Sequence, residues 1–74
     1  MTDTVLDLRG LKCPLPALRA RKALAGLPPG SRLVLECTDP MTAIDIPHLA
    51  SQTGHRLEAQ RREGDVLVFV IRTA

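Results

Sequence analysis

The chain has 74 residues, of which 45% are hydrophobic and 24% are charged, and its formal net charge is +2. A chain of this length forms one small domain, with room for an exposed site but hardly for an enclosed pocket with several catalytic groups. The weak positive charge does not require a nucleic-acid partner. With Phe69 as the only aromatic residue, a platform for stacking RNA bases is missing.

The sequence also lacks the patterns of membrane and export segments. Its longest apolar run, residues 66–71, is far too short to cross a bilayer. Asp3 and Asp7 occupy the region where a signal peptide would have basic residues before an apolar stretch. With two cysteines and no secretory signal, we expect a cytoplasmic protein with free thiols and no membrane contact.

The first part of the chain predicts a strand, a helix and a second strand. Residues 4–8 form a short strand, and residues 14–27 form a helix. Two prolines and a glycine at 28–30 stop this helix, because neither residue type continues it well. The alternating pattern of residues 32–38 is typical of a strand with one buried face.

The second part predicts a helix followed by a hairpin. Asp39 caps a helix over residues 40–53, in which Pro47 should cause a kink or a restart. Residues 56–63 and 66–72 form two strands joined by a two-residue turn that contains glycine. The order β-α-β-α-β-β predicts an α+β fold, a two-layer α/β sandwich with two helices on one face of a four-stranded mixed sheet. We expect a single domain over residues 1–74.

Cys13 is the residue best placed for chemistry. If Pro14 begins the first helix, Cys13 is its N-cap, and the positive end of the helix dipole favours a thiolate. Arg9 and Lys12 act in the same direction. Pro14 and Pro16 stiffen the junction but remove two backbone donors, so we predict a moderately lowered thiol pKa.

A helical wheel places Leu15 and Leu18 on the exposed side of this helix, with Lys12, Arg19 and Lys22 around them. A small apolar surface with a basic rim fits an acidic protein partner, although single exposed leucines are also common without any function. The residues that face the sheet in this wheel are Pro16, Ala17, Ala20, Ala23, Leu24 and Leu27.

The other chemically capable residues do not form a recognisable motif. His48 and His55 are distant from Cys13 in sequence, so spacing does not support a Cys-His pair. Cys37 shares a strand face with apolar residues and is expected to be buried and inert. The two cysteines are too far apart for a C-x-x-C pair, so neither a metal site nor a bound cofactor is predicted.

Asp39 and Asp45 are better explained as helix caps than as acid–base groups. An exposed thiol with no general base beside it suits a protein that carries a group rather than a self-contained enzyme. Such a protein accepts the group in one complex and passes it on in another.

Two blocks of the sequence resemble the TusA/SirA family of small sulfur-carrier proteins. The first, "LDLRGLKCPLPALRARKAL", contains the Gly-Leu-(Arg/Lys)-Cys-Pro-x-Pro turn, and the second is "GSRLVLECTDPMTAIDIP". The resemblance implies that Cys13 carries a persulfide and that Gly10, Pro14 and Pro16 support the motif, whose variable position is Leu15. It also implies a fold similar to the C-terminal domain of translation initiation factor 3.

By the same resemblance, the sulfur comes from a cysteine desulfurase or a rhodanese-type donor. It passes to a downstream acceptor, as in tRNA thiolation, sulfur oxidation or molybdenum-cofactor pathways. We expect a monomer that does not itself bind nucleic acid.

Two alternatives stay open. One is a regulatory or binding module of the same fold that contacts RNA through Arg56, Arg61 and Arg62, although charges on a strand also protect it from aggregation. The other is a redox switch that forms a disulfide between Cys13 and Cys37, which requires an accessible Cys37 and suitable geometry.

Overall fold

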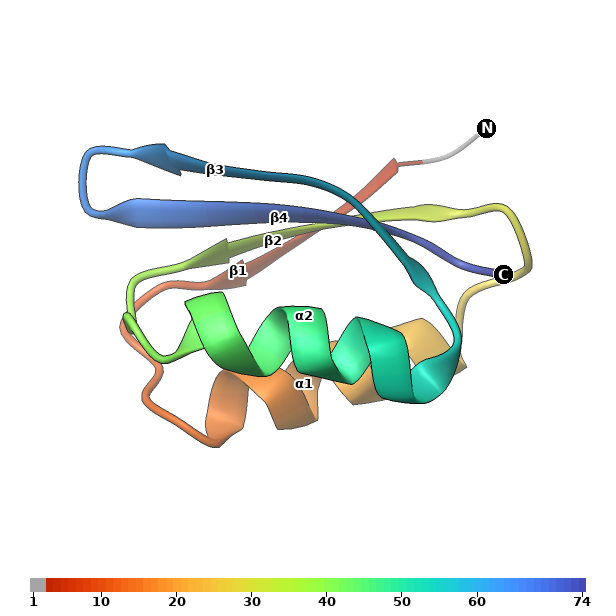
Figure 1. The fold of residues 1–74 in the computed structure, drawn as a ribbon, viewed down its shortest axis with the longest axis horizontal. Coiled ribbons are helices and arrows are strands. Elements are labelled where there is room, and N and C mark those ends of the chain that lie inside the picture. The colour runs from red at the N-terminus through yellow and green to blue at the C-terminus, as the bar shows by residue number, and fades with distance from the viewer. Residues whose placement is uncertain (1–2) are drawn as a thin grey trace.

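The computed structural model describes residues 3–74, which form two helices and four strands. Both helices lie against the same face of one sheet and leave its other face open (Figure 1). This is the predicted two-layer α+β architecture. The elements are β1 (Asp3–Leu8), α1 (Leu15–Ala25), β2 (Arg32–Cys37), α2 (Thr42–Thr53), β3 (Arg56–Glu63) and β4 (Val66–Arg72).

The sheet is mixed, with the strand order β1-β2-β4-β3. β1 and β2 are parallel, and α1 makes the long crossover that a parallel pair requires. β4 is antiparallel to both β2 and β3. In the hairpin, Glu63 pairs with Val66, and Gly64 has a φ of 62°, which glycine adopts without strain.

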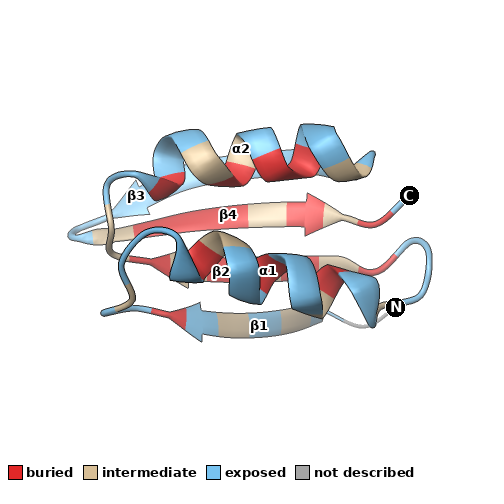
Figure 2. Cartoon of the chain, turned by 90° about the horizontal axis from the view of Figure 1, so that it is seen from below, coloured by how far each residue is buried: buried red, intermediate tan, exposed pale blue. Residues whose placement is uncertain are grey.

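The core fills the space between the sheet and the helices. Leu33, Leu35 and Cys37 are fully buried, which confirms the predicted face of β2. Phe69 of β4 and Ile46 of α2 are also fully buried in this layer. Figure 2 shows buried positions on the helix surfaces next to the sheet and exposed ones on the outer side.

α1 is shorter than predicted at both ends. It begins at Leu15 rather than Pro14, and it ends at Ala25 because the chain tightens there, with the Gly26 N–H donating to the carbonyl of Ala23 (3.1 Å). Its predicted sheet face is confirmed. Along that face Pro16, Ala20 and Leu24 are buried and Ala17, Ala23 and Leu27 are half-buried.

α2 runs without interruption through Pro47, so the predicted restart is wrong. Proline removes the hydrogen bond that would reach the carbonyl of Ala43, four residues earlier. Ala43 is exposed, so water can take over at this carbonyl, while Ile46 and Leu49 anchor the helix in the core. Neither helix within residues 3–74 is long and apolar enough to cross a membrane.

Candidate functional site

Cys13 lies in the loop between β1 and α1, and its side chain is exposed. Because β1 and β2 are parallel neighbours, this loop emerges beside the one that follows β2. Two hydrogen bonds join the loops: the Gly10 N–H donates to Thr38 Oγ1 (2.8 Å), and the Cys13 N–H donates to Asp39 Oδ2 (2.6 Å). Gly10 has a φ of 82°, a conformation that favours glycine. The loop before Cys13 is therefore fixed by its neighbour.

Asp39, in the loop after β2, links the Cys13 loop to the start of α2. Its second carboxylate oxygen accepts a hydrogen bond from the N–H of Met41, at the start of α2 (3.0 Å). The N–H groups of Cys13 and Met41 lower the pKa of Asp39, and the charge of Lys12 contributes less. The interpretation of Asp39 as the cap of a helix that begins at Pro40 is wrong, because α2 begins at Thr42, its N-cap is Met41 and no side chain caps it. Asp39 instead binds the N–H groups of Met41 and Cys13 ahead of the helix, and sequence reasoning missed its bond to Cys13.

Asp45 is the closest charged partner of the thiol. The Cys13 Sγ–H donates to Asp45 Oδ2 over 3.2 Å, from the α1 loop to the first turn of α2. Asp45 lies inside the helix and is half-buried, so its interpretation as a helix cap is wrong. The expectation that no acid–base group lies beside the thiol is therefore also wrong, because the Asp45 carboxylate does. The sequence signal for Asp45 was the Asp-Ile-Pro of the second block. Its position opposite Cys13 depends on how the two helices pack, which the sequence pattern does not show.

Cys13 is not the N-cap of α1, because Pro14 takes that position. Neither Pro14 nor Pro16 has an N–H, and the N–H of Leu15 donates to the carbonyl of Lys12 (2.9 Å). The first turn of the helix thus directs few donors at the sulfur.

The predicted lowering of the Cys13 pKa is wrong, since the structure raises it. The largest cause is the hydrogen bond to Asp45, followed by loss of water around the sulfur and by the negative charges of Asp45 and Asp39. Arg9 does not compensate because its guanidinium is paired with Asp7 at 2.9 Å, which lowers the pKa of Asp7 to about 2.

A small hollow of about 250 Å³ lies beside Cys13, between α1 and α2. Asp45 and His48 line it from α2, and Leu18 and Arg21 line it from α1. His48 therefore lies closer to the thiol than its sequence position indicated. His55 is elsewhere, and its Nδ1 accepts a hydrogen bond from the N–H of Ala74 (3.1 Å).

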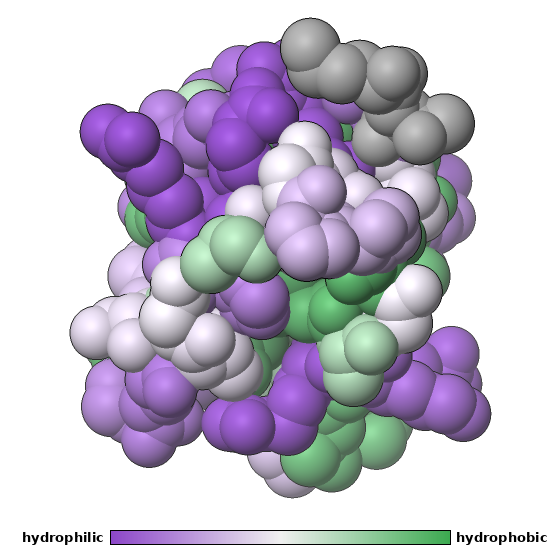
Figure 3. Space-filling view, turned by 90° about the vertical axis from the view of Figure 1, so that its right-hand side faces the viewer, coloured by the Kyte–Doolittle hydropathy of each residue, from purple (hydrophilic) through white to green (hydrophobic). Residues whose placement is uncertain are grey.

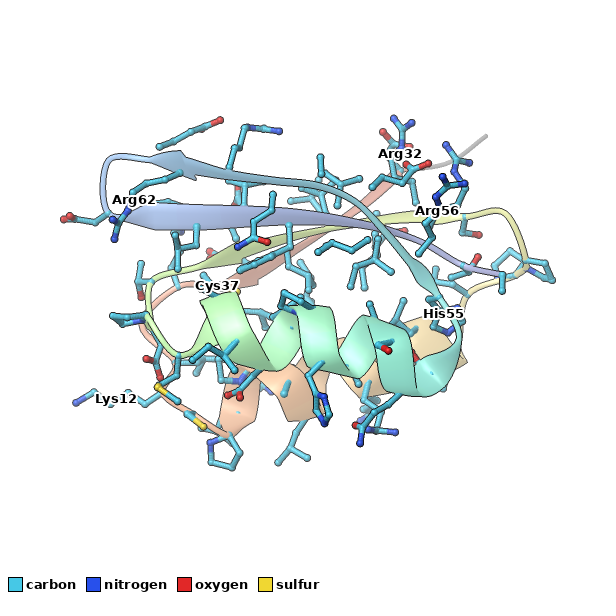
Figure 4. The ribbon with its side chains drawn as sticks, in the orientation of Figure 1. Lys12, Arg32, Cys37, His55, Arg56 and Arg62 are labelled. Carbon is cyan, nitrogen blue, oxygen red and sulfur yellow. The ribbon has the colours of Figure 1, made fainter. Side chains whose placement is uncertain are left out.

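Cys37 is fully buried, as predicted, and burial raises the pKa of its thiol to about 11. Figure 4 shows it between the sheet and the helix layer. A disulfide switch requires an accessible Cys37, and the structure does not provide one.

Four of the five predicted docking residues lie together. Leu15, Leu18, Arg19 and Lys22 line one groove beside β1. Lys12 is not part of it, and its side chain extends away from the molecule near the start of α1 (Figure 4).

The three arginines of the RNA-binding alternative do not form one patch. Arg56 and Arg62 lie at opposite ends of β3 (Figure 4), and Arg61 is paired with Glu63 at 2.5 Å. Within residues 3–74, no group of three or more histidine, cysteine, aspartate or glutamate side chains is arranged to hold a metal ion.

Comparison with known proteins identifies the family of this chain. The family model for "Sulfurtransferase TusA" matches residues 4–73, almost the whole chain. The chain belongs to the TusA family. It is 41% identical over 70 residues to the sulfur carrier protein TusA of Allochromatium vinosum, covering 95% of this chain and 92% of that protein.

Other relatives agree with this assignment. A putative sulfur carrier protein of Bacillus subtilis is 40% identical over 70 residues, with 95% of this chain and 93% of the relative covered. Among solved structures, a SirA-like protein from Desulfitobacterium hafniense superposes with a TM-score of 0.83 at 25% identity, covering 96% of both chains. The family match and the likeness in fold therefore agree.

Proposed function

We propose that this protein carries sulfur as a persulfide on Cys13, between a desulfurase or rhodanese-type donor and an acceptor protein. The observation that supports the proposal most strongly is the exposed thiol in a fixed Gly-Leu-Lys-Cys-Pro-Leu-Pro loop of a TusA family member. The bonds to Thr38 and Asp39 keep this loop in place without covering the sulfur. A carrier needs such an arrangement because its thiol must enter two different partners.

The transfer is an exchange between a thiol and a persulfide. The Cys13 sulfur attacks the outer sulfur of a donor persulfide, the donor S–S bond breaks, and the donor leaves as a thiol. The products are Cys13 persulfide and a reduced donor, so the step needs no external oxidant. Asp45 accepts the proton that Cys13 loses and returns it to the leaving sulfur. Delivery is the same exchange with the acceptor thiol as the attacking group.

The raised pKa of Cys13 gives the carrier two states with different reactivity. The free thiol stays protonated beside Asp45, which protects it from oxidants, because the thiolate is the reactive form. A persulfide is more acidic than a thiol, so the loaded sulfur ionises where the empty one does not. The carboxylate thus favours reaction inside a complex over reaction with solutes.

In the cell, we place this single-domain protein (residues 1–74) in the cytoplasm, in a relay that serves tRNA thiolation, sulfur oxidation or molybdenum-cofactor synthesis. The residues that would meet its partners are Leu15, Leu18, Arg19 and Lys22, around the groove next to Cys13.

The test is a complete cycle of loading and delivery. Purified protein is incubated with a rhodanese and thiosulfate, freed of both, and then given an excess of a small thiol. Its mass should rise by one sulfur atom on loading and return to the starting value on delivery, while Cys13→Ser gains nothing. Failure to gain sulfur from this donor, and from a cysteine desulfurase with cysteine, would refute the proposal.

A further inference from the structure

The two edges of the sheet differ in how they resist pairing with another strand. β3 has a register irregularity between Leu57 and Ala59 and is exposed at all but one of its residues. β1 pairs with β2 in unbroken register from Asp3 to Leu8. Bulges and charges are the usual means by which an edge strand avoids a new partner. β1 has no bulge, and its two charged residues, Asp3 and Asp7, lie near its ends and are paired with arginines. The charged residues of β3 are Arg56, Glu58, Arg61, Arg62 and Glu63.

An open groove of about 760 Å³ runs beside the β1 edge, between β1 and α1. Leu15 and Leu18 are 46% and 55% exposed there, and Leu6 of β1 is half-buried. Arg19 and Lys22 also line the groove, whereas none of the described residues that line it is acidic. Figure 3 shows apolar side chains at the surface between the sheet and the helices, bordered by hydrophilic ones.

We propose that an extended acidic segment of a partner protein pairs with the outer edge of β1 as a fifth strand of the sheet. Main-chain hydrogen bonds to β1 supply affinity, and the side chains on alternate positions of the segment, on the helix side of the sheet, enter the groove. Some of these groove-facing positions are apolar, and others carry carboxylates that face Arg19 and Lys22, which supplies the charge complementarity. The remaining positions lie on the open face of the sheet beside Asp3 and Asp7, so they are uncharged. The inference rests on the proposed function only in identifying the partner as a sulfur donor or acceptor.

The groove is adjacent to the sulfur. Leu18 lines both this groove and the hollow that contains Cys13 and Asp45. A segment held along β1 therefore brings the body of its protein to the Cys13 loop. Strand pairing depends mainly on the backbone, so one carrier can accept unrelated donors and acceptors at the same edge.

A second copy of this chain fits the edge less well. In an antiparallel β1–β1 pair, the two α1 helices would lie on the same face of the joined sheet and next to each other. Arg19 and Lys22 of one copy would then approach the same cations of the other, which is unfavourable. The charge of the groove selects an acidic partner.

The test uses Cys13→Ser protein, so that its outcome is independent of sulfur loading. Labelled protein is titrated with a short peptide that has leucine and glutamate at its groove-facing alternate positions and threonine at the others, and binding is followed by NMR and amide hydrogen exchange. We expect saturable shifts in α1 and β1 and about tenfold slower exchange of outward-facing β1 amides. A peptide with N-methylated backbone amides and one with lysine in place of glutamate should both bind at least about tenfold more weakly.

Two matched charge reversals locate the site. Arg19→Glu with Lys22→Glu should weaken the glutamate peptide about tenfold, whereas Arg56→Glu with Arg62→Glu on β3 should leave it nearly unchanged. Protection of β3 amides, equal loss in both double variants, or shifts in α1 without protection of β1 would each overturn the proposal. So would peptide-independent dimerisation through β1, or no binding at millimolar peptide. Because sulfur loading from thiosulfate is measured separately, either proposal can fail without the other.

Discussion

The two cysteines lie in contrasting surroundings within one small fold. Cys37 ends β2 inside the core, where it has no exposed surface and burial raises its pKa to about 11. Cys13 is exposed in a loop, and its pKa is raised mainly by a hydrogen bond to Asp45. The same direction of shift thus has two physical causes.

This difference in cause decides what each thiol can do. Cys37 stays buried in the folded protein, because exposing its thiol would require opening the packing between the sheet and the helices. The effect of Asp45 on Cys13 depends on one hydrogen bond of 3.2 Å at the surface, which a partner or a bound sulfur atom can change. A thiol that is restrained but accessible suits a carrier better than one that is permanently reactive.

The largest expected effect tests whether the two thiols differ in their accessibility to solvent. Cys13→Ser should abolish alkylation of the native protein by iodoacetamide at alkaline pH, where the exposed Cys13 of the wild type reacts, since Cys37 has no exposed surface. Reaction of the remaining thiol should appear only after denaturation, as followed by intact-mass spectrometry. Labelling of native Cys13→Ser would show that Cys37 is accessible and would favour the disulfide switch between the two cysteines.

The next effect concerns the cause of the Cys13 shift. Asp45→Asn removes the negative charge that opposes the thiolate, so the pKa of Cys13 should fall and alkylation at neutral pH should become several-fold faster. The measurement is the pH dependence of the alkylation rate in a Cys37→Ala background. Asp65→Asn, in the β3–β4 hairpin turn, is a control of the same chemistry and should change nothing.

An unchanged or higher midpoint in Asp45→Asn would mean that the carboxylate does not control the thiol.

A smaller effect is expected from the buried cysteine. Cys37→Ala removes one large atom from a tightly packed core, which should cost about 1 kcal/mol of unfolding free energy in urea. Sulfur loading should stay at the wild-type level. If loading fell to that of Cys13→Ser, Cys37 would have a chemical role that its burial does not explain.

The smallest effect tests the attachment of the Cys13 loop. The pKa of Asp39 is lowered in the folded protein, so its contribution to stability is present above its unfolded pKa and is lost as pH falls through the folded value. Asp39→Ala should be slightly less stable than wild type at neutral pH, and the difference should shrink in acid. A difference that persists at low pH would show that the charge of Asp39 does not hold the loop.

Local patterns were sufficient to predict most of the fold. The alternation in β2 and the glycine turn between β3 and β4 depend on neighbouring residues, and their predicted positions agree with the structure to within one residue. Pro47 was misleading because its penalty is local, whereas Ile46 and Leu49 hold α2 through contacts with the core.

The site was harder to predict because its partners are distant in sequence. Cys13 could be identified from its motif, but Asp45 is 32 positions away and reaches the sulfur only after both helices pack on the sheet. The prediction of an activated thiol considered the charges next to Cys13 in sequence. In the folded protein Arg9 is occupied by Asp7, and the nearest charge comes from another helix.

The most direct test of the account is to locate the transferred sulfur in the wild-type protein, with both cysteines present. After loading by a cysteine desulfurase with cysteine, the persulfides are trapped by alkylation and the digested peptides are analysed by mass spectrometry. The account predicts the additional sulfur on the peptide that contains Cys13, with Cys37 recovered as an unmodified thiol. Sulfur on Cys37, or a disulfide between the two cysteines as the main product, would contradict it.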